Sequence, residues 1–139
     1  MKIHVFCGAH ESIAFRLGII WSIARHGALF GGRLPAPTKR FTGVSDTVET
    51  FTSIPYLLNT RQGDCVGAAT YLCAWYLQQG IYARPVILRK KDKSLHCAVW
   101  VRGRILEATW IYRNMPGTEA FELRVPDMRS VQKQLRYML

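Results

Sequence analysis

Three residues that lie far apart in the chain carry the side chains needed for thiol chemistry at a carbonyl group. They are Cys65 in Gly63-Asp-Cys-Val-Gly67, His96 in Ser94-Leu-His-Cys-Ala98 and Glu107 in Ile105-Leu-Glu-Ala-Thr109. A thiolate is a nucleophile, an imidazole can remove and return its proton, and a carboxylate can orient the imidazole. These residue types predict a Cys-His-Glu catalytic triad for acyl transfer.

The first of these residues is expected at the start of a strongly apolar helix that runs from Asp64 to Gln79 and ends at Gly80. Asp64 is predicted to be the N-cap of this helix, since an aspartate there accepts a hydrogen bond from a backbone N–H group. The N–H groups and the positive dipole end of the first turn favour a thiolate, and they can also hold a developing oxyanion.

The other two residues are expected on neighbouring strands. Leu95 to Val101 and Arg104 to Trp110 alternate as strands do, and Arg102-Gly103 fits a two-residue hairpin turn. In that register Val101 faces Arg104, so that His96 and Glu107 become diagonal neighbours on one side of the sheet. Their backbones would lie ~7–8 Å apart, within reach of their side chains.

The remaining pattern predicts an α+β domain, because helices come first and an antiparallel meander follows. We expect a single domain over residues 1–139, with a core at about 45–125 and additional N- and C-terminal helices. Before the central helix we expect a strand over Lys2–Phe6, a helix over Ser12–His26 stopped by Gly27, a loop over Gly31–Arg40 and a short helix opened by a capping box of Asp46 and Glu49. A turn from Pro55 to Thr60 and a chain turn at Gln62-Gly63 then lead to the central helix. After it we expect strands over Arg84–Arg89 and Phe121–Val125 and a terminal helix capped by Pro126-Asp127.

The Gly-Asp-Cys at the helix start, the strand that opens on His96 and the Leu-Glu-Ala-Thr-Trp110 segment resemble the transglutaminase-like superfamily of papain-fold cysteine enzymes. The resemblance covers about Tyr56 to Trp110, and the order of cysteine, histidine and acid is that of the family. It implies a central helix packed on an antiparallel sheet, with Cys65 as nucleophile, His96 as base and Glu107 as third member. Small members of this superfamily are mostly peptidases or amidases, and similar short proteins occur in phage genomes.

Papain-type enzymes also use an amide side chain upstream of the cysteine as an oxyanion donor. Two residues of this chain are candidates for that role. Gln62 lies closer to the turn before the helix, whereas Asn59 has the spacing seen in papain-like enzymes. Both assignments stay open.

The amino-acid composition argues against several other classes of protein. With 49% hydrophobic and 20% charged residues, the 139-residue chain is expected to be globular, and no apolar run is long enough for a membrane span. No secretory signal is recognised, so we expect reduced thiols and a cytoplasmic protein, or a virion-associated one if a phage encodes it. His4, Cys7 and His10 lack a fourth ligand, so neither a metal nor a cofactor is predicted.

A net charge of +10 adds a second hypothesis about function. The basic loops at Lys39-Arg40 and Lys90–Lys93 are candidates for contact with an acidic protein or a nucleic acid. The sequence therefore predicts a cysteine peptidase or amidase that acts on a peptide or isopeptide bond of a peptide or protein substrate. The alternative is a binding or assembly protein, such as a virion or nucleoprotein component, with a vestigial site on the same scaffold. The sequence leaves the oligomeric state open.

Overall fold

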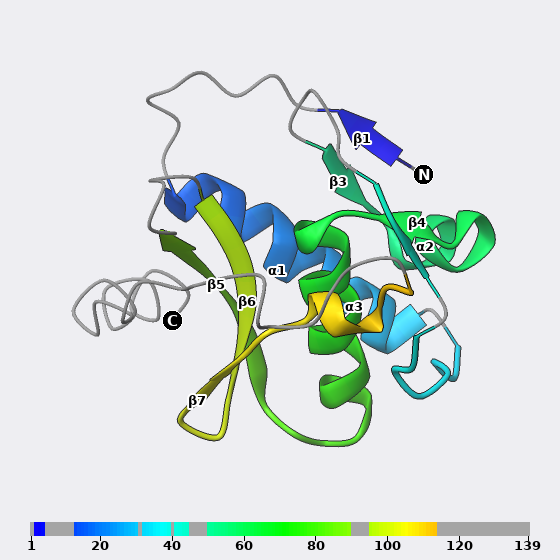
Figure 1. The fold of residues 1–139 in the computed structure, drawn as a ribbon. Helices are drawn as coiled ribbons and strands as arrows, with labels where there is room; N and C mark the ends of the chain where they lie inside the picture. Colours follow the sequence, from blue (N-terminus) through cyan, green and yellow to red (C-terminus); the bar gives the residue numbers. More distant parts are fainter. Residues whose placement is uncertain are drawn as a thin grey trace.

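The computed structural model describes residues 2–4, 13–30, 32–39, 41–44, 50–89 and 95–113. Its helices are α1 (Ile13–Phe30), α2 (Ile54–Thr60) and α3 (Cys65–Gln78), and a 3-10 turn spans Thr109–Ile111. Its strands are β1 (Lys2–His4), β2 (Thr42–Gly43), β3 (Thr50–Thr52), β4 (Gln62–Gly63), β5 (Ala83–Arg89), β6 (Leu95–Val101) and β7 (Arg104–Leu106). The expected α+β class is confirmed (Figure 1).

The largest sheet of the described residues is antiparallel, with the strand order β5-β6-β7. Val101 pairs with Arg104 and Val99 with Leu106, which confirms the predicted register. Arg102 and Gly103 have φ angles of 50° and 78°. Positive φ at both central residues is the mark of a type I′ turn, whose twist matches that of the flanking strands.

β7 is shorter than predicted. It ends at Leu106, and the chain continues into the 3-10 turn instead of forming a strand as far as Trp110. The N–H groups of Ala108 and Thr109 both donate hydrogen bonds to Oε1 of Glu107, at 2.9 and 3.0 Å. The carboxylate thus takes donors that a strand would use for its ladder, and this competition is why the second half of the strand prediction is wrong.

α3 lies at the centre of the core, as its apolar composition predicts. All its residues from Val66 to Ala74 are buried, and it packs against α1, β5 and β6 (Figure 1). Its end near Gly80 is also confirmed: Gly80 has a φ of 76°, and the N–H of Ile81 donates to the carbonyl of Tyr76 at 3.0 Å. A glycine in the left-handed region followed by a bond back into the last turn is a common helix stop.

α1 continues beyond the predicted stop at Gly27 and ends at Phe30. Gly27 is buried where α1 meets α2, and a Cβ atom on it would lie 2.3 Å from Cγ1 of Ile54. The glycine therefore permits close packing and does not end the helix, which is why the prediction is wrong. Within the described residues no helix has the length and apolarity required to cross a bilayer.

The smaller elements agree in part with the predictions. The strand expected over Lys2–Phe6 is present as β1, which pairs antiparallel with β3. The turn expected from Pro55 is α2, with Ser53 as its N-cap. A chain turn was expected at Gln62-Gly63, and the structure has the short strand β4 there, paired parallel with β2.

Several predicted elements lie outside the described residues. These are the short helix opened by Asp46 and Glu49, the strand over Phe121–Val125 and the terminal helix after Pro126-Asp127. Of the loop predicted over Gly31–Arg40, residues 32–39 are described, and they contain neither helix nor strand, as expected.

The role of Gly27 can be tested with two alanine variants in the same helix. Gly27→Ala should lower the free energy of unfolding by about 1–3 kcal/mol, since the new methyl group meets Ile54. Gly18→Ala should raise it by roughly 0.5–1 kcal/mol, because nothing lies within 4 Å of a Cβ there and alanine favours the helix. Urea unfolding measures both, and equal stabilities of the two variants would contradict the packing role.

Candidate functional site

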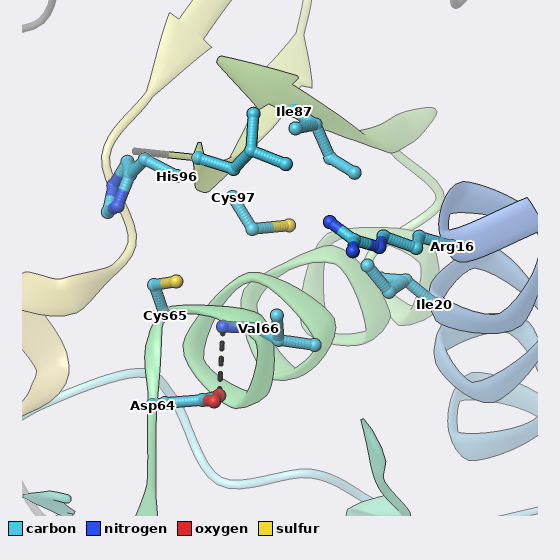
Figure 2. Close-up of a pocket in the computed structure, with 9 residues that line it drawn as sticks. Arg16, Ile20, Asp64, Cys65, Val66, Ile87, His96 and Cys97 are labelled. Atoms are coloured by element: carbon cyan, nitrogen blue, oxygen red, sulfur yellow. Dashed lines mark hydrogen bonds between the residues drawn. The ribbon is translucent and has the colours of Figure 1, made fainter. Parts of the chain in front are cut away.

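The structure brings the three predicted residues together from three different elements. Cys65 is the first residue of α3, His96 is the second residue of β6, and Glu107 follows the end of β7. Figure 2 shows Cys65 and His96 at the same end of a pocket. The residues that line this cavity of about 110 Å³ are Arg16, Ile20, Asp64, Cys65, Val66, Ile87, Leu95, His96 and Cys97.

His96 and Glu107 form a buried ion pair. Nε2 of His96 lies 2.5 Å from Oε2 of Glu107, and the two side chains are 2% and 4% exposed. The other carboxylate oxygen, Oε1, accepts hydrogen bonds from the N–H groups of Ala108 and Thr109 and, at 2.9 Å, from Oγ1 of Thr109. Because both oxygens have partners, the carboxylate is fixed, and it fixes the orientation of the imidazole in turn.

The charges of the pair stabilise each other despite burial. Burial lowers the pKa of His96, but hydrogen bonds with the side chains of Cys65 and Glu107 and the negative charge of both groups outweigh it and raise the pKa to about 9. Burial acts to raise the pKa of Glu107, but hydrogen bonds with His96 and Thr109 and the charge of His96 lower it below its ordinary value. The site therefore favours an imidazolium beside a carboxylate at neutral pH.

Asp64 is the N-cap of α3, as predicted. Its Oδ1 accepts hydrogen bonds from the N–H groups of Val66 and Gly67 at 3.0 and 3.1 Å. The N–H of Ala68 donates to the carbonyl of Asp64. The expectation that the first turn as a whole offers N–H groups to an oxyanion thus needs correction: the cap engages these donors, and the N–H of Cys65 is the one that it leaves for a ligand.

Tyr112 stabilises the start of α3 through a hydrogen bond. Its hydroxyl donates to the carbonyl of Asp64. A Cβ atom on Gly63 would lie 2.9 Å from the Tyr112 hydroxyl and 3.0 Å from Cδ1 of Leu57. Glycine before Asp64 is therefore required for this close approach, which sets the position of Cys65.

The described cysteines other than Cys65 are buried, as small core residues are expected to be. Cys73 is fully buried in α3, and its thiol donates to the carbonyl of Ala83. Burial raises the pKa of both Cys73 and Cys97. Cys97 also lines the pocket (Figure 2), a position that the sequence did not indicate. Cys7 lies outside the described residues.

The candidate amide donors lie away from the pocket. Asn59 is in the last turn of α2 and Gln62 is in β4, and the side chains of both are exposed. Neither belongs to the lining of the cavity. An oxyanion role for either residue stays a prediction.

Besides Cys97, sequence reasoning missed three polar residues around the site: Arg16, Thr109 and Tyr112. Thr109 had one signal, because the predicted register places it opposite His96. Arg16 and Tyr112 come from segments far from Cys65 in the chain, and only tertiary packing brings them to α3. Among the described residues no group of histidine, cysteine, aspartate and glutamate side chains could hold a metal ion.

The raised pKa of His96 predicts a specific pH dependence of stability. In the unfolded chain His96 loses its proton near its ordinary pKa of 6.5, whereas in the folded protein it keeps the proton up to about pH 9. The stabilisation is therefore complete below about pH 6.5 and is lost as the pH rises to about 9, by as much as about 3 kcal/mol.

Urea unfolding of the protein and of His96→Gln at several pH values from 6 to 9 provides the measurement. The difference between their free energies of unfolding gives the contribution of His96 and of its contacts with Cys65 and Glu107. This difference should shrink with rising pH. If it stays constant, protonation of His96 does not stabilise the fold.

Comparison of the chain with protein-family models, with curated proteins and with solved structures finds no match. The side chains of Cys65, His96 and Glu107 and the pocket beside them are therefore the basis on which a function can be proposed.

Proposed function

We propose that this protein is a cysteine peptidase or amidase that cleaves a peptide or isopeptide bond through an acyl-thioester on Cys65. The observation that carries the proposal is the buried His96–Glu107 ion pair beside a half-buried thiol at a helix start. A buried charge pair with a full set of hydrogen bonds is an expensive arrangement for packing alone. Perturbed pKa values in a pocket are typical of catalytic groups.

In the proposed reaction the Sγ atom of Cys65 attacks the carbonyl carbon of the substrate. The thiol proton has by then passed to His96, which holds it on Nδ1, the ring nitrogen on the side away from Glu107. The tetrahedral intermediate collapses to a thioester as the C–N bond breaks, and the imidazolium gives its proton to the leaving amine. Water then attacks the thioester with His96 as base, which releases the acid and regenerates the thiol.

The elements that carry the proposed catalytic groups support this mechanism. The helix start supplies the nucleophile and, through the N–H of Cys65, a donor for the developing oxyanion. The sheet supplies the base, and the turn after β7 supplies the group that orients it. We propose on the same grounds that the chain is a small member of the transglutaminase-like superfamily, with α3 and the β5-β6-β7 sheet as its papain-like core.

The alternative of a vestigial site on a binding protein rests on charge. Of the basic loops that motivate it, Lys39 is described and exposed, whereas Arg40 and Lys90–Lys93 lie outside the described residues. No described contact favours a nucleic-acid or acidic-protein partner over the peptidase. We keep the binding protein as the outcome that a failed reactivity test would favour.

The proposal predicts selective alkylation of Cys65 by iodoacetamide. Cys65 should react at pH 7 at least about tenfold faster than Cys73 or Cys97, which are buried and hold their protons. His96→Gln should slow the reaction at Cys65 by at least about tenfold, because the base is lost. Peptide mapping by mass spectrometry after timed quenching gives the rate at each cysteine.

Cys73→Ser is the matched control, since it removes a thiol but keeps a donor toward Ala83. It should leave the rate at Cys65 unchanged. Glu107→Gln should give an intermediate rate, because the imidazole stays in place but loses its charged partner. A rate at Cys65 that does not depend on His96 would refute the proposed mechanism and favour the binding alternative.

A further inference from the structure

We infer that the pocket beside Cys65 accepts a carboxylate group of the substrate and that Arg16 binds it, an inference that rests on the proposed function. The substrate class is then an amide or peptide that carries a carboxylate close to the reacting bond. That carboxylate is either an acidic side chain or a free chain terminus.

The size of the cavity indicates that it holds a part of a substrate. Its volume of about 110 Å³ is well below the ~300–1,000 Å³ of sites that enclose a whole small-molecule ligand. Cys65 and His96 stand at one end of it. A group that enters the cavity therefore belongs to the substrate next to the bond that is attacked.

Arg16 reaches this cavity from the first half of α1. Figure 2 shows its guanidinium extended toward Cys97, on the side of the cavity away from Asp64. The side chain as a whole is half-buried and its Nε atom is covered by protein, so the terminal nitrogens of the guanidinium are the donors that a group in the cavity can reach. A half-buried charge is stabilised by an acceptor of opposite charge beside it, so a carboxylate in the cavity is a favourable partner.

Four apolar side chains line the same cavity as Arg16. Ile20 comes from α1, Val66 from α3, Ile87 from β5 and Leu95 from β6. An apolar substituent would fit these walls but would displace water from the guanidinium and leave its charge without compensation. A carboxylate fits the same walls with its methylene groups and forms a charge-assisted bond with Arg16, which is stronger in apolar surroundings.

The other charged groups among the described residues of the lining already have partners. The imidazole of His96 is paired with Glu107, and the carboxylate of Asp64 caps α3. Among the described residues of the lining, Arg16 is thus the cation that is available to a substrate anion. Its position at the far side from the thiol makes it a specificity-determining residue and not a catalytic one.

The test uses alkylating reagents that carry a carboxylate at increasing distance from the reactive carbon. N-iodoacetyl-glycine resembles a free chain terminus, whereas N-iodoacetyl-β-alanine and N-iodoacetyl-γ-aminobutyrate resemble acidic side chains. Each is compared with its own carboxamide, and each rate at Cys65 is divided by the rate with 2-mercaptoethanol. At least one carboxylate should react about tenfold faster than its carboxamide, and the reagent that does so identifies the source of the carboxylate.

Arg16→Gln should abolish this preference, measured as the ratio of the carboxylate rate to the carboxamide rate within the same variant. Arg25→Gln is the matched control, because Arg25 lies on the same helix, is exposed over the ring of Trp21 and changes the net charge equally. It should keep the preference. Arg16→Lys retains the charge and should keep part of it, which provides a second variant if the glutamine variant unfolds.

Two results would overturn the inference. One is a ratio of carboxylate to carboxamide rates within about twofold for every reagent, and the other is a preference that persists in Arg16→Gln. In either case, fast His96-dependent reaction of the carboxamides would leave the proposed function intact. If the carboxamides react no faster with the protein than with His96→Gln, the proposed function itself fails.

Discussion

The ion pair between His96 and Glu107 is the interaction on which the rest of the site depends. A buried carboxylate is tolerated only with a full set of partners, and Glu107 obtains them from His96 on one oxygen and from Ala108 and Thr109 on the other. The same bonds end β7 and start the 3-10 turn. One side chain thus determines where the sheet stops, how the imidazole is oriented and which of its nitrogens can serve the thiol.

A second constraint places the thiol opposite that imidazole. Tyr112 comes just after the 3-10 turn, and its hydroxyl holds the carbonyl of Asp64 immediately before α3. The turn that Glu107 creates is therefore also the turn that brings Tyr112 to the helix start. Because His96, Glu107 and Tyr112 all lie within residues 96–112, the positions of Cys65 and His96 are coupled through the hydrogen bonds of this stretch and do not depend only on packing of the distant core.

Much of this arrangement follows from the sequence where local rules govern it. The Arg102-Gly103 turn determines the register, and the register alone is enough to predict that His96 lies near Glu107. Asp64 is predictable because caps follow residue type. The end of β7 is not, since a side chain takes the backbone donors, and the role of Gly27 depends on Ile54, which is distant in sequence. Arg16 has no signal in the sequence, since only the packing of α1 on α3 brings it to the pocket.

The positive charge of the protein and the cation in the pocket act over different ranges. A net charge of +10 attracts any anion to the surface, but salt screens such attraction beyond about 8–10 Å. It can raise the rate of encounter with an acidic substrate, yet it cannot choose which bond meets the thiol. Arg16, half-buried at the far side of the cavity, is screened less than a fully exposed charge. If the proposed chemistry is right, long-range charge governs how often a substrate arrives and Arg16 governs how it is aligned.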